Sequence, residues 1–231
     1  MRRILKPELL DTLPADDPRA IGSRRDLRRV NALMGNAAIC QRAIDGLLDG
    51  RVPRKLIELG CGDAEFLAVI ARRKSLGWNN LEVWLVDRIA IVSESTLHIF
   101  REAGWTAHVV NADVFDWMKV APQADICLAN LFLHHFAEDQ IATLLIDIAS
   151  HAAAFAACEP RRSVPALWAS HALWLLGCNA VTRHDAVVSV RAGFASNEIS
   201  RLWSMVESWD LSERPAGSFS HLFTARRTKR A

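Results

Sequence analysis

Residues 56–66 of the chain, LIELGCGDAEF, decide the fold. A short apolar run begins at Leu56 and leads into the pair Gly60 and Gly62. Glycine lets the backbone turn tightly and lets a ligand approach without a Cβ atom in the way. An amphipathic segment that begins at Ala64 predicts a helix after the turn. A strand, a glycine turn and a helix in this order are typical of the ligand-binding edge of an open α/β sheet.

Three carboxylates surround this turn. A dinucleotide site would have a third glycine at position 65 and a helix N-terminus free to hold a pyrophosphate. The chain instead has Glu65, with Asp63 beside the turn and Glu58 within the expected strand. Negative charge here repels a diphosphate and attracts a ligand with an ammonium group. The turn therefore argues against a nicotinamide dehydrogenase.

Short apolar runs alternate with amphipathic segments from residue 54 onward. This alternation predicts an α/β fold with a doubly wound, mostly parallel seven-stranded sheet covered by helices on both faces. We expect strands at 55–59, 81–86, 106–110, 124–129, 153–158, 208–211 and 218–226, and helices at 64–73, 92–103, 139–150, 165–176 and 197–207.

Residues 1–52 predict a helical cap or lid that precedes a main domain of residues 53–231. We expect its helices at 7–12, 23–34 and 36–48, with Ser23 as an N-cap. This is the most basic part of the chain. A solvated helix face explains most of its arginines, and contact with an anion or a substrate is the alternative.

Two further acidic residues follow later strands. Asp87 ends the second expected strand, where a carboxylate can accept both hydroxyl hydrogens of a ribose. Asp113 follows the third strand and offers an acceptor for an adenine amino group. A helix cap at Asp87 and an Asx-turn at Asp113 are the structural alternatives. Together with Glu58 and Asp63, these acids describe a site for an adenosine with a positively charged tail.

Residues 54–160 resemble the class I S-adenosylmethionine-dependent methyltransferases. The resemblance rests on ELGCGDA at 58–64, VD at 86–87, NAD at 111–113 and ADICLANLFLHHF at 124–136. It implies the Rossmann-like methyltransferase fold and S-adenosyl-L-methionine as the cofactor.

The first turn of that family holds the methionine part of the cofactor, the acid after the second strand holds the ribose, and the Asp after the third strand binds adenine. One departure is Ala64, where the family has a third glycine, and this change would tighten the pocket. The resemblance implies a cofactor site made of Glu58, Gly60, Cys61, Gly62, Asp63, Asp87, Arg88, Asp113, Val114 and Asn130.

Three histidines are candidates for a general base. His134 and His135 follow the fourth expected strand, and imidazole is suited to take a proton from a phenol near neutral pH. Packing or a backbone hydrogen bond is the plainer alternative for each of them. His184, beside Asp185, is the third candidate. The chain has no Tyr, so a tyrosine phenol cannot be the base.

The expected acceptor is a small apolar molecule. Relatives that methylate nucleic-acid bases carry Asn or Asp-Pro-Pro-aromatic after the fourth strand, where this chain has NLFL at 130–133. The run RAGFASNE at 191–198 resembles methyltransferases of bacterial secondary metabolism. We therefore expect O-methylation of a phenolic or quinone-like acceptor. The alternatives are an RNA or protein methyltransferase, or a methyltransferase-like binding subunit without turnover.

The composition limits the class of protein. The chain has 231 residues, a formal net charge of +2 and 51% hydrophobic residues, which excludes intrinsic disorder and gives no reason to expect a nucleic-acid partner. Five scattered cysteines, none at metal-binding spacing, predict a reduced, cytoplasmic protein without a metal site. The acidic residues near the N-terminus interrupt any signal peptide.

Residues 163–182 carry no formal charge. Their length allows a transmembrane helix, but Pro165, Gly177 and Asn179 interrupt the segment, so we predict no membrane span. We expect a buried helix or pocket wall whose Trp168 and Trp174, with His171, enclose the acceptor beneath the lid. A subunit interface, which would make the protein a homodimer, and a membrane contact are the alternatives.

Overall fold

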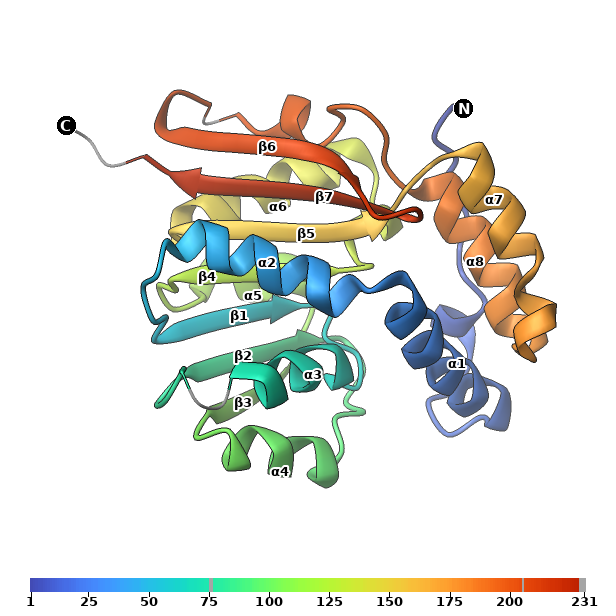
Figure 1. The fold of residues 1–231 in the computed structure, drawn as a ribbon, viewed down its shortest axis with the longest axis horizontal. Coiled ribbons are helices and arrows are strands. Elements are labelled where there is room, and N and C mark those ends of the chain that lie inside the picture. The colour runs from blue at the N-terminus through green and yellow to red at the C-terminus, as the bar shows by residue number, and fades with distance from the viewer. Residues whose placement is uncertain (75–76, 205, 229–231) are drawn as a thin grey trace.

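A seven-stranded sheet forms the centre of the computed structural model, which describes residues 1–74, 77–204 and 206–228. The strand order is β3-β2-β1-β4-β5-β7-β6 (Figure 1). Strands β1 to β5 are parallel, and β7 runs antiparallel to both of its neighbours. The strands are β1 Lys55–Leu59, β2 Glu82–Asp87, β3 Thr106–Asn111, β4 Ile126–Asn130, β5 Ala154–Pro160, β6 Trp209–Ala216 and β7 Ser220–Arg227.

Helices cover both faces of this sheet, so the predicted doubly wound, mostly parallel α/β architecture is confirmed. One buried core joins the sheet to α2, α3 and α4, and a second core joins the other face to α5 and α6 (Figure 1). The helices are α1 Pro18–Met34, α2 Asn36–Leu48, α3 Glu65–Lys74, α4 Glu94–Glu102, α5 Val114–Trp117, α6 Glu138–His151, α7 Val164–His171 and α8 Ala180–Ala192. Short 3-10 helices lie at Leu10–Thr12, Met118–Val120, Leu133–His135, Leu173–Leu176, Ser200–Leu202 and Val206–Ser208.

The first two helices occupy different places. Helix α2 packs on the sheet, and its Ile44 is fully buried in the same core as Leu56 of β1. Helix α1 lies beyond the carboxyl ends of the strands, beside α8 (Figure 1). Gly35 separates the two helices in the left-handed conformation, at φ +70°. The residues before Gly35 are therefore placed to cover the strand ends, whereas most of α2 lies along the sheet.

Several helix expectations are wrong. Helix α1 begins at Pro18 with Asp17 as its N-cap, whereas Ser23 is buried inside the helix and accepts a hydrogen bond from Thr182. The helix expected at 197–207 is replaced, among the described residues of that range, by two single 3-10 turns, and residue 205 lies outside the described residues. Helix α8 was not expected, because its mixture of β-branched and charged residues has only a weak helical pattern.

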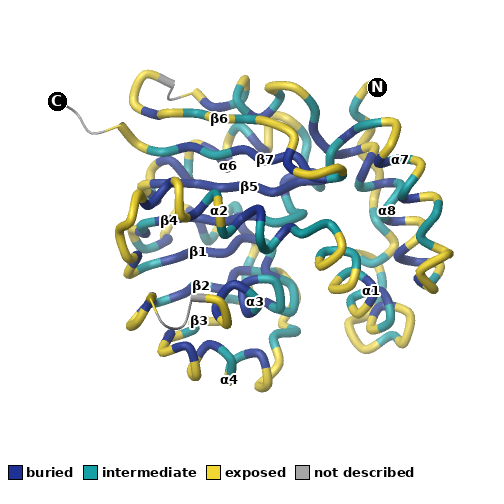
Figure 2. The backbone as a smooth tube through the Cα atoms, in the orientation of Figure 1, coloured by how far each residue is buried: buried dark blue, intermediate teal, exposed yellow. Residues whose placement is uncertain are grey.

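The expectation that residues 163–182 form a buried helix or a wall of the acceptor pocket is also wrong, because none of them lines the large cavity. Trp168 is 75% exposed and Trp174 is 60% exposed. Helix α7 packs through its small residues Ala166 and Ser170, which are buried, whereas Val164 and Trp168 are exposed. Figure 2 colours the backbone by burial, and both buried and exposed positions occur along α7. Within the described part of the chain, no helix has the length and apolar character needed to cross a membrane.

Candidate functional site

A cavity of about 940 Å³ lies at the carboxyl ends of β1, β2 and β4, below the N-terminal segment and α1. All ten residues of the expected cofactor site line this cavity, and so do His134 and His135. His184 is not among the lining residues. The cavity therefore brings together every predicted cofactor and base residue except His184, whereas Trp168, His171 and Trp174, which were expected to enclose the acceptor, do not line it.

The glycine turn after β1 has two positions that serve different purposes. Gly60 adopts φ +65°, and a Cβ atom added to it would lie 2.1 Å from Cδ2 of Phe132. Gly62 adopts φ +53°, and no atom lies within 4 Å of the place where its Cβ would be. Gly60 is thus required for packing, and Gly62 leaves space at the cavity wall. Ala64, at φ +57°, is buried in the core behind the turn.

Asp87 ties the first two loops of the sheet edge together. Its Oδ2 accepts a hydrogen bond from the backbone N–H of Gly62 at 2.9 Å, and its Oδ1 accepts one from Ile89 at 2.8 Å. A carboxylate oxygen has two lone pairs, so each oxygen keeps one acceptor position after these contacts. Asp87 can therefore hold the turn in place and also receive the two hydroxyl groups of a ribose.

Glu58 has no partner for one of its carboxyl oxygens. Its side chain is buried on β1 and lines the cavity, and Oε2 makes no hydrogen bond with any residue described. Burial first, and then the charges of Asp63 and Asp87, raise the pKa of Glu58 well above its usual value. A buried, unpaired carboxyl group is costly unless a ligand supplies its partner. The wall of the cavity is therefore suited to a cationic group at this point.

Helix α1 contributes a contact that the sequence did not predict. The Arg28 guanidinium donates to Oδ2 of Asp63 at 2.7 Å, which brings a positive charge beside the glycine turn. Behind it, the buried Asn36 donates to Asn31 at 2.8 Å and to Asn130 at 3.2 Å. These amides join the end of β4 to the junction between α1 and α2.

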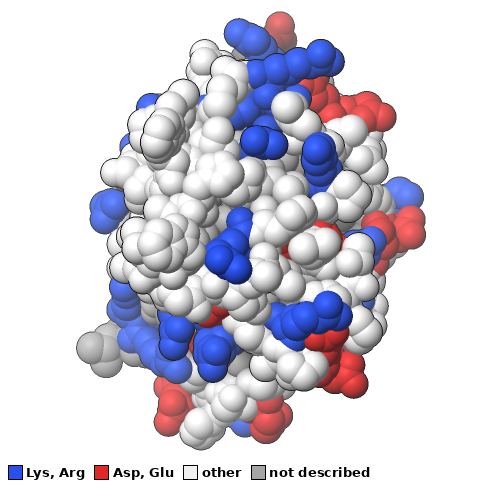
Figure 3. Space-filling model, turned by 90° about the vertical axis from the view of Figure 1, so that its right-hand side faces the viewer, with Lys and Arg blue, Asp and Glu red and all other residues white. Residues whose placement is uncertain are grey.

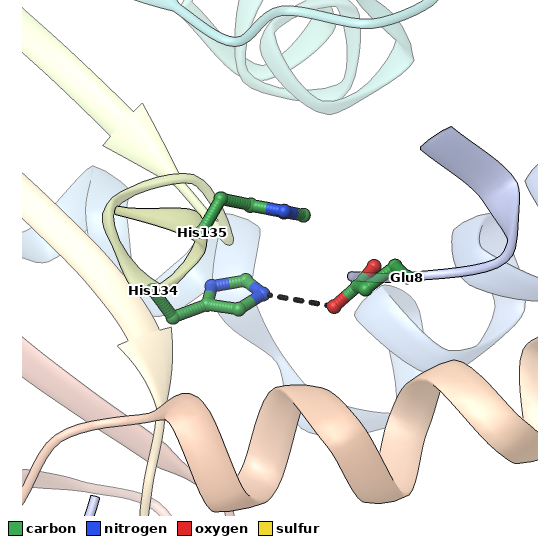
Figure 4. A group of neighbouring side chains, drawn as sticks. All are labelled: Glu8, His134 and His135. Carbon is green, nitrogen blue, oxygen red and sulfur yellow. Dashed lines mark hydrogen bonds and ion pairs between the residues drawn. The ribbon is translucent and has the colours of Figure 1, made fainter. Parts of the chain in front are cut away.

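His134 lies between the carboxylates of Glu159 and Glu8. Figure 4 shows the contact with Glu8. The Nδ1 atom of His134 is 2.8 Å from Oε2 of Glu159, and its Nε2 is 3.3 Å from Oε1 of Glu8. Each nitrogen must carry a proton to donate to its carboxylate. Burial disfavours that charge, but the hydrogen bonds that His134 donates to Glu159 and Glu8 outweigh it and raise the pKa of His134 to about 9. His134 is therefore a cation near neutral pH rather than a free base.

The two carboxylates that hold His134 are themselves fixed. Glu159 is fully buried in β5 and accepts hydrogen bonds from the backbone N–H groups of Phe132 and Leu133, at 3.1 and 2.8 Å. Glu8 accepts a hydrogen bond from Ser189 of α8. Burial favours neutral Glu8, but the hydrogen bond and charge of His134 prevail and lower the pKa of Glu8 to about 2. The pair therefore fastens the N-terminal segment to the end of β4.

His135 is in a different situation, although its ring lies 4.3 Å from that of His134. It lines the cavity with its side chain 26% exposed, and its Nδ1 is 3.3 Å from Oδ2 of Asp11. Its Nε2 makes no hydrogen bond with the residues that the structure describes. Asp11 can hold a proton on Nδ1, which leaves Nε2 able to accept one. Of the two adjacent histidines, His135 has the geometry of a base.

A metal ion also has potential ligands here. One ligand atom each from Glu8, His134 and His135 lie within 4.8 Å of one another (Figure 4). The spacing of residues along the chain did not suggest this group, because Glu8 comes from the N-terminal segment. The close ion pair between Glu8 and His134 accounts for the arrangement without a metal.

His184 lies on α8, beside a second cavity of about 440 Å³. Its Nδ1 is 2.9 Å from Oδ1 of Asp185. Asp185 is buried and accepts the backbone N–H groups of Leu9 and Leu10, at 2.8 and 2.9 Å. The His-Asp pair thus anchors the N-terminal segment at a place outside the large cavity.

No protein-family model matches this chain, and no curated protein matches it. Among solved structures, it is similar to the plantazolicin methyltransferase BpumL in complex with SAH, with 13% identity, a TM-score of 0.63 and coverage of 92% of both chains.

Two longer proteins are also similar. An O-methyltransferase family protein from Burkholderia thailandensis has 18% identity and a TM-score of 0.63, and the match covers 93% of this chain and 61% of that one. The mitomycin 7-O-methyltransferase MmcR has 16% identity and a TM-score of 0.62, with coverage of 95% and 60%. This chain spans about three fifths of the length of these two proteins. It therefore has the Rossmann-like methyltransferase fold that the sequence resemblance implied.

Proposed function

We propose that the chain is an S-adenosyl-L-methionine-dependent methyltransferase that O-methylates a small apolar acceptor. The observation that carries this proposal is the unpaired carboxyl group of Glu58, which faces one cavity together with the glycine turn and Asp87. This set fits a ligand with an ammonium group and a ribose. The similarity to BpumL, a methyltransferase of the same fold with SAH bound, supports the choice of ligand.

Different residues of this chain would contact different parts of the cofactor. Glu58 would receive the ammonium group, and Arg28 beside Asp63 would receive the carboxylate of the methionine part. Asp87 would hold the ribose. Asp113 caps α5 by accepting the N–H of Phe115 through Oδ1, and its Oδ2 would receive the adenine amino group. Bound there, the cofactor supplies a methyl group on a positively charged sulfur.

The acceptor would lie at the end of the cavity near His134 and His135. Leu10, Leu13, Phe132 and Phe136 line it, and they would exclude water from an aromatic acceptor. The Nε2 atom of His135 would take the proton of the acceptor hydroxyl, which makes the oxygen a better nucleophile. His134, whose two ring nitrogens both contact carboxylates, would hold the N-terminal segment beside the acceptor.

The remaining expectations follow from this proposal. A cavity of about 940 Å³ fits a small-molecule acceptor beside the cofactor better than an RNA or a protein. All five cysteines are free and buried, which supports a reducing, cytoplasmic environment. The homodimer stays a prediction.

Ligand-dependent thermal unfolding tests the cofactor. S-adenosylhomocysteine at about 100 times its dissociation constant should add roughly 2.7 kcal/mol to the free energy of unfolding. NAD at the same concentration should add nothing. A response to NAD alone, or no response to S-adenosylhomocysteine, would contradict the proposal.

Turnover with phenols and hydroquinones tests the proposed acceptor and the role of His135. The substitution His135→Asn should lower methyl transfer about a thousandfold while S-adenosylhomocysteine still binds. A matched control is His98→Asn, because His98 is an exposed histidine of α4 that pairs with Glu102. Cofactor binding without methyl transfer to any acceptor would favour a methyltransferase-like binding subunit. Methyl transfer only to RNA or protein would favour an RNA or protein methyltransferase.

A further inference from the structure

Helix α7 and the 3-10 helix after it expose an unusual amount of apolar surface. Besides Trp168 and Trp174, the exposed side chains are Leu175, Leu176 and Val164, at 66%, 52% and 55%. Single exposed apolar residues are common, but several large ones on one short segment mark an interaction surface. None of these residues lines the large cavity. The proposed methyl transfer therefore leaves this surface unexplained.

The exposed charges on α7 and α8 themselves have one sign. Between residues 160 and 197 the only acidic residue is Asp185, and it is 4% exposed with both oxygens occupied by backbone N–H groups. Arg183 and Arg191 of α8 are exposed and form no side-chain hydrogen bond or ion pair with the described residues. The helical pair α7 and α8 therefore presents cations and apolar groups to solvent, and no carboxylate.

The second cavity connects these two kinds of residue. Trp174 lines it together with Arg183 and Arg191, and the N-terminal segment adds Ile4 and Lys6. Figure 3 shows the corresponding face of the molecule, where blue side chains lie among a largely white surface and red gathers mainly toward the margin. We define the basic apolar face as Ile4, Lys6, Val164, Trp168, Trp174, Leu175, Leu176, Arg183 and Arg191.

We propose that the basic apolar face docks the protein on a membrane surface rich in anionic phospholipids. Tryptophan and leucine at the edge of a short helix enter the boundary between headgroups and acyl chains. Lysine and arginine beside them pair with lipid phosphates and gain from the negative surface potential. Because α7 and α8 are too short to span a bilayer, the protein lies on the surface.

Charge complementarity favours this occupant over a second copy of the chain. A two-fold dimer would place the same patch against itself, so Arg183 and Arg191 would meet cations. The face has no exposed carboxylate to pair with them. An anionic lipid surface satisfies the apolar groups and the cations together.

Co-sedimentation of the full chain with lipid vesicles tests the proposal. Vesicles of phosphatidylcholine with about one third phosphatidylglycerol should sediment the protein at low salt, whereas vesicles of pure phosphatidylcholine should bind it at least about tenfold more weakly. The double variant Trp168→Ser with Trp174→Ser should lower partition into the anionic vesicles at least about tenfold. The double variant Arg183→Glu with Arg191→Glu should remove the preference for anionic lipid.

A matched control changes one apolar residue and one cation elsewhere. Ile146 of α6 is 42% exposed and Arg72 of α3 is exposed, so Ile146→Ser with Arg72→Glu should leave vesicle binding unchanged. Retained S-adenosylhomocysteine binding in every variant separates this test from that of the proposed function. The proposal is overturned by no sedimentation with anionic vesicles, or by equal sedimentation of the tryptophan variant. A stable dimer in solution that the tryptophan variant dissociates would also overturn it, because a second copy would then cover the face.

Discussion

The two ends of the large cavity are built in different ways. At the glycine turn, neighbouring strand ends of one sheet supply the side chains, and backbone hydrogen bonds to Val86 and Asp87 hold the loops. At the histidine end, a contact between Glu8 and His134 spans 126 positions of sequence. The first end is a property of the sheet, whereas the second exists only while the N-terminal segment is in place. The two ends should therefore respond separately to substitution.

The largest effect should come from the glycine turn. Gly60→Ala adds a Cβ atom 2.1 Å from Phe132 at a residue with φ +65°, so both overpacking and backbone strain oppose it. We expect a loss of about 4 kcal/mol in the free energy of unfolding, measured by urea denaturation. Gly46→Ala is the control, because Gly46 is an exposed position of α2 with open space around it, and it should stabilise the protein by up to about 1 kcal/mol. Equal effects at the two glycines would contradict the packing role of Gly60.

The next effect concerns the histidine end and depends on pH. The pKa of His134 rises from 6.5 to about 9, so its stabilisation is complete below pH 6.5 and is lost as pH rises through 9. The pKa of Glu8 falls from 4.5 to about 2, so its stabilisation is complete above pH 4.5 and is lost as pH falls through 2. The pair therefore stabilises the fold most between pH 4.5 and 6.5.

Glu8→Gln should cost about 2 to 3 kcal/mol of unfolding free energy inside that window. The cost should shrink toward either extreme, as measured by urea denaturation across the pH range. Glu102→Gln, at an exposed pair, should cost less than about 1 kcal/mol at any pH. Binding of S-adenosylhomocysteine to Glu8→Gln should stay within about threefold of the unsubstituted protein. Loss of that binding would mean that the two ends are not separate.

A smaller effect is expected at Asp87. Asp87→Asn removes the charge and one of the two acceptor oxygens, so S-adenosylhomocysteine should bind about thirtyfold more weakly. This change corresponds to about 2 kcal/mol of binding free energy. Isothermal titration calorimetry measures this change. Asp116→Asn is the control, because its side chain is 82% exposed and pairs only with Lys119 among the described residues. If Asp87→Asn left the affinity for S-adenosylhomocysteine unchanged, Asp87 would only hold the glycine turn and would not contact the ribose.

The smallest effect should come from helix α1. The ion pair between Arg28 and Asp63 is partly exposed, so Arg28→Ala should change the free energy of unfolding by less than about 1 kcal/mol. It should still weaken S-adenosylhomocysteine binding about fivefold, because the guanidinium would contact the ligand carboxylate. Arg25→Ala, at an exposed position of the same helix, should leave the affinity unchanged. Equal affinities of the two variants for S-adenosylhomocysteine would mean that Arg28 does not contact the ligand.

The difference between the two ends of the cavity explains which features the sequence could predict. The sheet, its order of elements and the grouping of Glu58, Asp87 and Asp113 follow from local patterns, because parallel strands place their carboxyl ends at one edge. The partners Glu8 and Glu159 did not follow, because no local pattern links them to His134. Trp168 was expected in the interior, since its segment lacks charge, but burial depends on which residues of a short helix are small enough to pack.

The position of β7 has a consequence for how the chain folds during synthesis. This strand is made after β6 yet lies between β5 and β6, with antiparallel pairing on both sides. Strand β6 has no neighbour other than β7 in the described sheet. The ribosome must therefore release residues up to 227 before the sheet can close. Until then, the edge of β5, including Glu159, lacks its neighbour. The nascent chain would expose this strand edge, which is a natural target for a chaperone.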